Sequence, residues 1–457
     1  MVSGWGRSLS SHSEVVKISS SRVLHDIVAT RPIRGVTARG LGRSYGDAAI
    51  NSGGTVAEIP ETFHSDSSSQ FLDIDSENKR ARINAGVSIE QMLRSLVPAG
   101  FFVPVTPGTR FVTLGGAIAA DIHGKNHHVD GTFGRHVSSM NVMLSNGDVI
   151  SLDREVTSDW FWATVGGMGL TGVVLDAVVD LIPITTNKIT VTTQRARNID
   201  ELFQLMSDAD ADNTYRYSVA WVDMLSRGDS FGRGVLTRGD HASIAQVQDN
   251  GGQPVLTYDP KTKVAIPKHF PSGVLNLGSI KAFNEVWYRK APKTPVENLE
   301  SMTGFFHPLD GVRQWNRMYG PKGFLQYQCV VPMAATHVLR EIMTTMQEAR
   351  IPSFLAVLKR MGPSNPGFLS FPMEGWTLAV DIAVGSTQLA SVLRVIDEKV
   401  IDAGGRHYLA KDAHMSPRTM AAGYPQLDKW RDIQKEMDPQ GMWTSDLARR
   451  LRLLGEQ

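Results

Sequence analysis

Apolar and polar positions alternate in several short stretches of the first 185 residues, and this period of two is typical of half-buried strands. Residues 71–87 contain two such stretches around a polar turn and predict a hairpin. A second hairpin is predicted at 141–153, where Asn146-Gly147 supplies the tight turn. A further strand is expected at 171–182. The N-terminal part of the chain is therefore predicted to be mixed α+β.

Two short helices are predicted between these strands. Ser88 and Gln91 have the spacing of a capping box, and Gly100 is expected to end the helix that they begin. Ser158 is predicted to cap the second helix. The stretch GLGRSYG at 40–46 is not in phase with G-x-G-x-x-G, and no clear parallel strand–helix alternation surrounds it. A Rossmann unit is therefore not expected.

From about residue 187 to 400 the glycine density falls, and alternating strand and helix patterns predict an α+β domain with an antiparallel sheet. Strands are expected at 215–224, 323–332 and 376–384, and helices at 336–349 and 387–404. The stretch from about 240 to 280 has no strong period and contains four prolines, which predicts a long mobile loop. Because 457 residues exceed what one core usually serves, two domains, or one discontinuous domain with an insertion, are expected.

Composition excludes several classes of protein. The chain is 42 % hydrophobic and 20 % charged, with a net charge of +1, so nothing indicates nucleic-acid binding. Its single cysteine, Cys329, excludes an intramolecular disulfide and a cysteine metal cluster. No apolar run has the length of a signal peptide or a membrane span. A lipid substrate would therefore have to be met from the membrane surface.

Glycine clusters mark the first candidate site. In the stretch 39–47, successive backbone N–H groups can form an anion-binding nest, and Arg43 and Ser44 suit the binding of a pyrophosphate. A glycine-rich surface turn is the plain alternative, because glycine is common in turns.

The stretch DIHGKNHH at 121–128 holds three histidines. On a helix, His123 and His127 would share a face and could bind a metal, but Gly124 and Asn126 disfavour a helix. A pocket without a metal, or ordinary loop histidines, remain as the alternatives. Lys411 lies among small and apolar neighbours, where burial could lower the pKa of its amine, although most lysines are solvated.

Five segments together resemble one family of flavoenzymes. They are ARGLGRSYGD (38–47), PGTRFVTLGGAIAADIHGKNHH (107–128), FWATVGGMGLTG (161–172), FLQYQCVVP (324–332) and YLAKD (408–412). In this order they are similar to the decaprenylphosphoryl-ribose oxidase family, the flavin-dependent half of the 2-epimerase that serves arabinan synthesis in the actinobacterial cell wall. This family belongs to the vanillyl-alcohol-oxidase-like flavoenzymes. The resemblance runs nearly end to end, from residues 4–7 to 445–451.

The resemblance implies an α+β, two-domain fold of the vanillyl-alcohol-oxidase (PCMH) type. An FAD-binding domain would comprise residues 1–186 plus 406–457, and an inserted substrate domain would comprise residues 187–405. The glycine clusters would then wrap FAD. The cofactor-binding residues implied are Ala38, Arg39, Gly40, Leu41, Gly42, Arg43, Ser44, Tyr45, Gly46, Asp47, Ala48, Gly108, Thr113, Leu114, Gly115, Gly116, His123, Gly124, Lys125, Asn126, Val174 and Tyr408.

The implied activity is FAD-dependent oxidation of the C2 hydroxyl of decaprenylphosphoryl-β-D-ribose to a 2-keto intermediate. Lys411 matches the family's active-site lysine, acting as a base if neutral or stabilising an anion if charged. His123 and Tyr45 are the other catalytic candidates. The substrate-binding residues implied are Lys125, Ser218, Phe306, Gln326, Gln328, Lys359, Thr377, Ala379 and Lys411.

Three departures or distinctions refine this expectation. Many members carry a cysteine where this chain has Ala379, so reagents that trap that thiol covalently are not expected to act. Phe306 replaces a tyrosine of some members and removes one possible hydrogen bond. FAD is expected to be bound non-covalently, with His123 unmodified, as in the closer family.

The partners implied are a polyprenyl-phosphate sugar, an NADH-dependent keto-reductase subunit and the membrane surface. The protein is expected in the cytoplasm or periplasm, associated with the membrane at the cell envelope. A flavin oxidase of a soluble sugar or alditol is the nearest alternative. A metal-dependent hydrolase and a non-catalytic scaffold are the alternatives from other classes.

Overall fold

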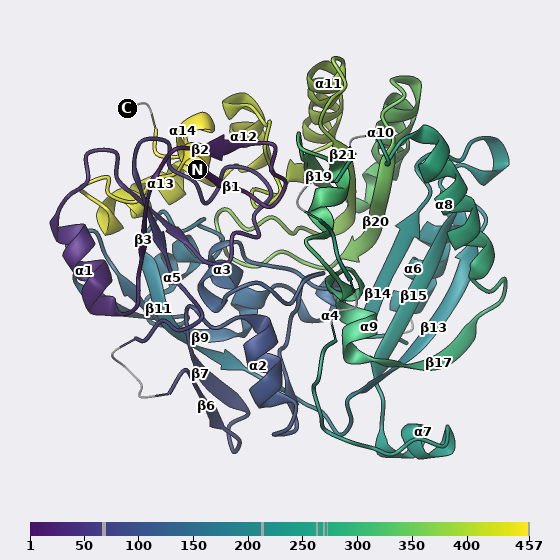
Figure 1. Ribbon diagram of the computed structural model, residues 1–457, viewed down its shortest axis with the longest axis horizontal. Helices are drawn as coiled ribbons and strands as arrows, with labels where there is room; N and C mark the ends of the chain where they lie inside the picture. The colour runs from purple at the N-terminus through teal and green to yellow at the C-terminus, as the bar shows by residue number, and fades with distance from the viewer. Residues whose placement is uncertain (66–69, 212–213, 262–263, 268–269, 272, 456–457) are drawn as a thin grey trace.

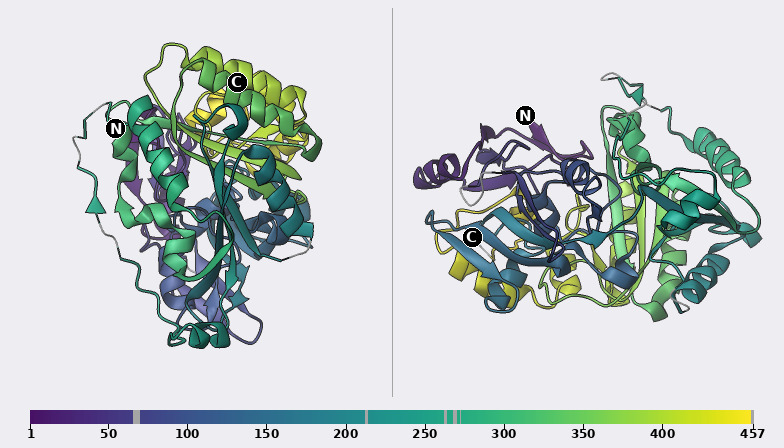
Figure 2. Two further views of the ribbon diagram at one scale, coloured as in Figure 1. Left: turned by 90° about the vertical axis from the view of Figure 1, so that its right-hand side faces the viewer. Right: turned by 90° about the horizontal axis from the view of Figure 1, so that it is seen from below.

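The computed structural model describes residues 1–65, 70–211, 214–261, 264–267, 270–271 and 273–455. The N-terminal part (purple and blue) and the C-terminal part (yellow) lie together on the left of Figure 1, and a large sheet built from the middle of the chain occupies the right. The view from below in Figure 2 shows the same two halves side by side. The middle of the chain is thus inserted between two segments that pack on each other.

A small parallel sheet begins the first half. Its order is β3-β5-β4, formed by β3 (Glu14–Lys17), β5 (Thr55–Glu58) and β4 (Val36–Arg39), with α1 (Ser21–Ala29) between β3 and β4. The expectation of no parallel strand–helix alternation was wrong here, because four-residue strands are too short to show a period. The glycine-rich stretch after β4 leads to a strand rather than to a helix, so the turn is not that of a Rossmann unit.

A five-stranded antiparallel sheet lies beside it. Its order is β10 (Val149–Asp153), β9 (Val137–Met143), β11 (Val173–Asp180), β7 (Arg80–Asn84) and β6 (Leu72–Asp75). Both predicted hairpins are confirmed, and Gly147 takes the positive φ of 89° that their second turn needs.

The two predicted helices are present with altered ends. Ser88 and Gln91 form the predicted capping box of α2 (Ile89–Leu96), but the helix stops before Gly100. The helix α5 (Ser158–Thr164) has Thr157 as its N-cap, so the prediction that Ser158 caps it was wrong. The Thr157 hydroxyl accepts a hydrogen bond from the backbone N–H of Asp153 at 2.7 Å. Thr157 is thus bonded to the residues before the helix, and the helix begins at Ser158.

The second half is an antiparallel sheet of eight strands, which confirms the predicted class of this region. Its order is β17 (Val296–Ser301), β13 (Lys188–Ala196), β15 (Gly234–His241), β14 (Tyr217–Val222), β20 (Ser353–Met361), β21 (Gly375–Ala383), β19 (Phe324–Val331) and β22 (Arg406–His407). The helices α6 (Ile199–Ala211), α10 (Thr336–Glu348) and α11 (Leu389–Asp402) cover one face.

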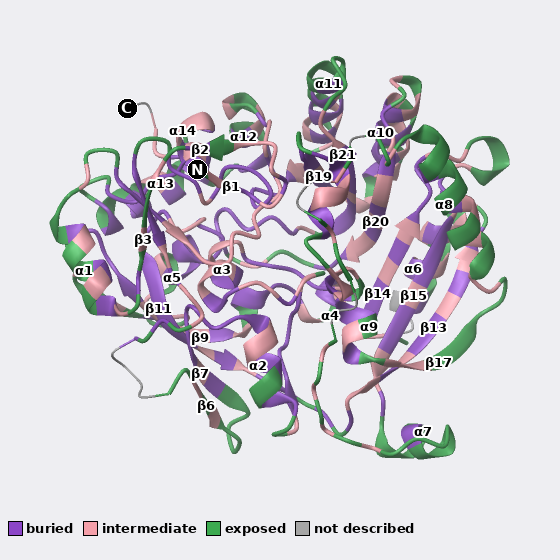
Figure 3. Cartoon of the chain, viewed as in Figure 1, coloured by how far each residue is buried: buried purple, intermediate pink, exposed green. Residues whose placement is uncertain are grey.

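Alternation along the strands decides what each face carries. In β19 the odd-numbered residues Leu325, Tyr327 and Cys329 belong to the core under the helices, whereas Gln326 and Gln328 face the opposite side. Figure 3 shows the central strands as mostly buried on both faces. The opposite face is turned toward the first half over β19 to β21, and its polar positions are therefore available for a site between the halves.

The prediction of one long loop at about 240–280 was wrong at its ends. The helix α7 (Ile244–Asp249) begins with a capping box at Ser243, and α8 (Leu277–Lys290) begins with one at Asn276. The short strand β16 (Val264–Ala265) pairs with β18 (Val312–Arg313). Residues 262–263, 268–269 and 272 lie outside the described residues, and the predicted mobility of the segment stays a prediction.

The C-terminal segment starts on the large sheet and ends on the first half. After β22 the helices α12 (Pro417–Gly423), α13 (Leu427–Met437) and α14 (Asp446–Arg450) follow. Trp430 of α13 donates a hydrogen bond to the carbonyl of Ala163 at 2.9 Å. The remaining elements are β1 (Val2–Ser3), β2 (Ser10–Ser11), β8 (Phe101–Phe102), β12 (Ile182–Pro183), α3 (Leu114–Ala119), α4 (His127–Asp130) and α9 (Met302–Phe306), with five 3₁₀ turns at 133–136, 228–230, 308–311, 315–319 and 333–335.

Among the described residues, every helix is too short or too polar to cross a bilayer.

Candidate active site

The glycine loop, residues 38–48, leaves the end of β4 and turns over the N-terminal segment. Its carbonyls at Ser44 and Tyr45 accept hydrogen bonds from the backbone N–H groups of Trp5 and Gly6, at 2.7 and 3.0 Å. The N–H groups of residues 41–44 have no acceptor among the described residues. These four donors are half-exposed and consecutive, which is the arrangement that binds a phosphate.

Two glycines of this loop are required by close packing. A Cβ on Gly40 would lie 2.3 Å from the Thr113 hydroxyl, and one on Gly46 would lie 1.9 Å from the carbonyl oxygen of Asp412. Thr113 caps α3 through its hydroxyl, which accepts from Gly116 N–H at 3.3 Å. The glycine loop is therefore pressed against two other predicted FAD segments, near α3 and near Lys411.

Arg43 supplies a positive charge at this loop. Its guanidinium lies over the Trp5 ring at 4.0 Å and over the Phe111 ring at 5.1 Å. Burial lowers its pKa, which Asp310, Tyr45 and Glu61 partly offset. Its buried Nε has no hydrogen-bond partner within the described part of the chain. A buried cationic donor without an acceptor fits a pyrophosphate, which supports this loop as the place for FAD.

Asp121 anchors the start of the histidine-rich segment, residues 121–128. Its buried carboxylate accepts hydrogen bonds from Gly134 N–H at 2.9 Å, from the Asn365 amide at 2.7 Å and from the Ser370 hydroxyl. Burial raises the pKa of this carboxyl despite these donors. The Asp121 carboxylate thus holds residues 365–370 against the segment.

The three histidines do not converge. α4 begins at His127, so His123 and His127 do not share a helix. His127 Nδ1 accepts from Gly362 N–H at 3.0 Å, and His128 Nε2 lies 3.2 Å from the carbonyl of Tyr215. Within the described ranges, no group of three or more His, Cys, Asp or Glu side chains is placed to hold a metal.

His123 stands at the junction of the two halves. Its Nδ1 lies 2.9 Å from Lys359 Nζ, and its Nε2 lies 3.0 Å from the side-chain amide of Gln328. Its ring packs against Tyr408 at 5.4 Å and Phe371 at 5.8 Å. Burial, reinforced by the charge of Lys359, holds the pKa of His123 well below its usual value. The imidazole is therefore neutral near pH 7.

Lys411 is partly buried and lies over an aromatic ring. Its Nζ lies 3.8 Å from the centroid of the Tyr45 ring. Burial lowers the pKa of Lys411 to about 7, against the opposing effect of Asp381. The same burial, with the charge of Asp381, raises the pKa of Tyr45 well above 10, so the phenol keeps its proton. Near neutral pH the amine is thus balanced between its two protonation states.

Three partly buried lysines form what we call the lysine pocket, defined as Lys125, Lys359 and Lys411 with His123. Burial, then the charges of Lys411 and Lys125, lower the pKa of Lys359 to about 7. Burial lowers the pKa of Lys125 to about 8, with Glu300 opposing. The Lys359 amine also contacts the Gly124 carbonyl at 3.2 Å. Mutually repelling cations kept together in this way favour an anionic ligand.

The strands β19, β20 and β21 bring the predicted substrate residues together. Gln328 opposes Ala379, and Lys359 opposes Thr377, in the antiparallel register. The Gln328 amide contacts the Thr377 hydroxyl at 3.2 Å. The methyl group of Ala379 is half-exposed beside them. All these positions share the sheet face opposite α6, α10 and α11, so the structure groups them around His123.

Lys125, Ser218 and Phe306 are three further residues that were predicted to bind substrate. Lys125 Nζ donates to the carbonyl of Phe305 and lies 4.2 Å from its ring centroid. Ser218 N–H donates to the carbonyl of Lys125 at 2.9 Å, and the Ser218 hydroxyl is buried without a partner among the described residues. Phe306 is 2 % exposed and packs on Phe102 at 4.9 Å. It thus lies in an aromatic core next to the pocket.

Other predicted cofactor residues have identifiable surroundings. Tyr408 donates to the carbonyl of Ala120 at 2.8 Å, which closes the end of α3. Val174 is buried in β11, and Gly108 is exposed with open space around it. The carboxylate of Asp47 points away from the glycine loop and binds Arg450 at 2.7 and 2.8 Å.

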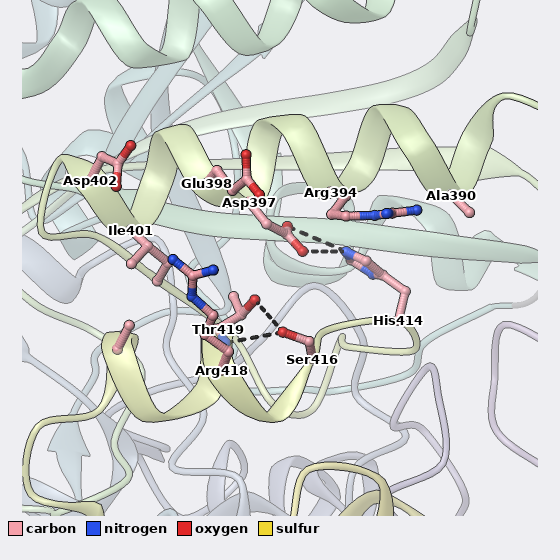
Figure 4. A pocket seen from close by; sticks show the side chains of 11 residues that line it. Ala390, Arg394, Asp397, Glu398, Ile401, Asp402, His414, Ser416, Arg418 and Thr419 are labelled. Atoms are coloured by element: carbon pink, nitrogen blue, oxygen red, sulfur yellow. Dashed lines mark hydrogen bonds and ion pairs between the residues drawn. The ribbon is translucent and has the colours of Figure 1, made fainter.

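A charged network that the sequence analysis missed fixes the loop of Lys411. Asp412 Oδ2 lies 2.8 Å from Arg450, which also binds Asp47 of the glycine loop. His414 lies 3.2 Å from Asp397 and 3.5 Å from Asp412. Figure 4 shows His414 pointing toward Asp397 of α11 at the edge of a cavity of about 400 Å³. The network ties Lys411 to both halves.

Asp381 is the second missed residue. It is fully buried, accepts from the Tyr319 phenol at 3.1 Å and from the Gln326 amide at 2.5 Å, and burial raises its pKa to about 6. The signal that could have found it is its period of two with Thr377 and Ala379 on one strand.

Comparison with known proteins places this geometry in a family. An FAD binding domain model matches residues 15–153, and a D-arabinono-1,4-lactone oxidase model matches residues 328–451. Decaprenylphosphoryl-beta-D-ribose oxidase of Mycolicibacterium smegmatis is 41 % identical over 455 residues, which are 99 % of this chain and 97 % of that protein. The chain belongs to the decaprenylphosphoryl-ribose oxidase family. It is an FAD-dependent oxidoreductase, and the predicted two-domain FAD fold with an antiparallel sheet is confirmed.

Two more distant relatives match either nearly the whole chain at low identity or only part of it. L-gulono-1,4-lactone dehydrogenase of Mycobacterium tuberculosis is 20 % identical over 98 % of each chain. A glycolate oxidase subunit of Bacillus subtilis is 33 % identical over 145 residues, which are 30 % of this chain and 31 % of that protein. The decaprenylphosphoryl-ribose oxidase relative thus combines the higher identity with coverage of nearly the whole chain.

Proposed function

We propose that this family member oxidises the C2 hydroxyl of a polyprenyl-phosphoryl ribose, decaprenylphosphoryl-β-D-ribose, to the 2-keto product. This would be the first half of an epimerisation that yields an arabinose donor. The observation that carries the proposal is Lys411, held over the Tyr45 ring in a group of three lysines whose pKa values are lowered to between about 7 and 8. Such a site suits both a proton transfer and a phosphate.

The glycine loop and α3 would hold FAD, which supplies the hydride acceptor when it is bound. The free N–H groups of residues 41–44 and the guanidinium of Arg43 would bind its pyrophosphate. The two ring nitrogens of His123 are in contact with Lys359 and Gln328, which supports a non-covalent cofactor. We expect acid precipitation of the protein to leave all of the FAD in the supernatant.

Lys411 would take the proton of the C2 hydroxyl. With its pKa near 7, the neutral amine is substantially populated at physiological pH and can accept a proton, and the resulting ammonium is stabilised by Asp381. Neutral His123 and Gln328 would orient the sugar by hydrogen bonds. The phenol of Tyr45 stays protonated and positions the amine by contact with its ring.

The remaining two lysines would bind the phosphate of the substrate. The substrate's phosphodiester carries one negative charge, and this charge between Lys359 and Lys125 would favour their charged forms and relieve their mutual repulsion. Epimerisation requires the 2-keto product to be reduced again at C2, so we propose an NADH-dependent keto-reductase subunit as the partner. The decaprenyl chain implies contact with the membrane surface.

Flavin absorbance tests the proposal directly. The purified holoprotein, mixed without oxygen with farnesyl-phosphoryl ribose, should lose its absorbance near 450 nm. Free ribose and arabinitol serve as controls. Bleaching by the free sugars without bleaching by the lipid phosphate would assign the protein to the soluble-sugar oxidases and refute the proposed substrate. A protein that contains no flavin, and binds none when FAD is added, would refute the proposal altogether.

A further inference from the structure

The helix α8 presents large apolar side chains to solvent. Phe283, Val286 and Trp287 are 39 %, 68 % and 44 % exposed, and their spacing of three and four residues puts them on one side of the helix. The rings of Phe283 and Trp287 are stacked with their centroids 6.1 Å apart. We call these three residues, with Lys290 one turn further, the α8 face. Figure 3 shows the helix as largely exposed.

Basic residues lie along α8 and just after it, with Lys290 within the α8 face and Lys293 closely after it in the chain. The stretch 277–293 contains Lys281, Arg289, Lys290 and Lys293, all exposed, and Glu285 is its only acidic residue. The Glu285 carboxylate is already paired with Arg233 at 2.6 Å and with Arg289. An exposed aromatic and aliphatic face bordered by unneutralised lysines has the composition of a surface that binds anionic lipid.

The α8 face continues into the candidate active site. Phe283 packs on Phe354 with centroids 4.9 Å apart. Phe354 in turn packs against the buried cluster of Trp315, Tyr319, Phe324 and Tyr45, and it is the ring of Tyr45 that lies 3.8 Å from Lys411. An unbroken apolar path therefore leads from an exposed patch to the amine that would take the substrate's proton.

We propose that the α8 face docks the protein on the surface of an anionic membrane. The inference rests on the proposed function in one respect: a polyprenyl chain stays in the bilayer, so the site that takes its sugar has to open next to the lipid. Aromatic side chains at the interface and lysines over the anionic headgroups would hold the protein with its apolar path facing the bilayer.

Vesicle flotation of the holoprotein tests the docking surface. Wild-type protein should float with vesicles of phosphatidylcholine and phosphatidylglycerol, and should float much less with phosphatidylcholine alone or at high salt. The double variant Val286→Asp, Trp287→Ser should bind the anionic vesicles about tenfold or more weakly. Val395→Asp, at a 45 % exposed position of α11, is the matched control and should bind like wild type.

The outcomes separate the docking surface from the activity. Wild-type protein that does not float, or a double variant that floats as well as wild type, would overturn the proposal. Self-association of wild-type protein that the double variant abolishes, without any lipid binding, would assign the α8 face to a second copy of the chain and would overturn it too. Reduction of the flavin by farnesyl-phosphoryl ribose in solution should be the same in all variants. Failure of that reaction in wild type would instead refute the proposed function and leave the flotation result standing.

Discussion

The glycine loop and the lysine pocket are neighbouring parts of one site, but one presents backbone groups and the other presents charged side chains. The glycine loop presents backbone N–H groups, is half-exposed, and gains its shape from glycines pressed against Thr113 and Asp412. The lysine pocket is also only partly exposed, but it presents side chains whose positive charges repel one another and are costly to keep together. The difference indicates two tasks: the loop binds a large cofactor through shape, and the pocket adjusts protonation for chemistry.

Lys411→Met gives the largest expected effect and tests whether the pocket alone carries the chemistry. Removal of the base should slow reduction of the flavin by substrate about 100-fold or more. The ratio of absorbance at 450 to 280 nm should be unchanged, because the glycine loop is intact. Lys429→Met, at an exposed lysine, is the control. A variant that reduces its flavin at the normal rate would exclude Lys411 as the base.

Arg43→Met is the converse experiment on the glycine loop. Loss of the charged donor should weaken FAD binding about 10- to 100-fold, measured by titration of apoprotein. The protein that is saturated with FAD should be reduced by substrate at nearly the normal rate. Arg394→Met, on the exposed side of α11, should change neither quantity. Equal affinity of Arg43→Met and wild type for FAD would contradict the proposed contact between the Arg43 guanidinium and the pyrophosphate of FAD.

Asp381→Asn should shift the pH dependence by a moderate amount. The rate of flavin reduction in wild type should rise as the pH passes through about 7, because the neutral form of Lys411 accepts the proton. The carboxylate of Asp381 raises the pKa of this amine, so its removal should move the rise to lower pH. Asp428→Asn, whose side chain is 90 % exposed, should leave the profile in place. A profile that moves to higher pH would contradict the assigned base.

Ala379→Cys should have the smallest effect on turnover, less than about threefold, because hydride transfer from a sugar needs no thiol. The variant should nevertheless gain one thiol that reacts with a maleimide and is protected by substrate. Wild-type protein should stay unlabelled, since Cys329 is buried and burial raises the pKa of its thiol to about 12. A labelled variant that keeps full activity would place position 379 outside the pocket, and labelling of wild type would contradict the burial of Cys329.

Local sequence patterns predicted the individual helices and strands better than they predicted how these elements pack together. The hairpins around Asn146-Gly147 and at 71–87 follow from alternation and turn chemistry, both of which act between near neighbours. The parallel sheet of β3, β4 and β5 escaped prediction because its four-residue strands are joined by contacts distant in sequence. The helix α7 escaped it because neighbouring prolines hid a capping box at Ser243.

The site could be predicted where its residues lie in recognisable motifs, and not where single residues arrive from separate strands. The segment at 121–128 and Lys411 stand in motifs of the family. Asp381, by contrast, acts through charge on a lysine thirty residues away; its period of two with Thr377 and Ala379 places it on their face of the strand but does not predict this interaction. The link from Asp412 through Arg450 to Asp47 joins both ends of the chain and could only be seen in three dimensions.

The two-residue strand β22 limits how this chain can be recombined with its relatives. Arg406 and His407 pair with Val330 and Cys329, so the sheet of the middle region is completed by residues that come after it in the chain. A chimaera or an excised fragment cut at residue 405 would leave β19 with an open hydrogen-bonding edge, which invites pairing between molecules. A chimaera that exchanges this sheet between related proteins and stays soluble should therefore include the residues up to His407.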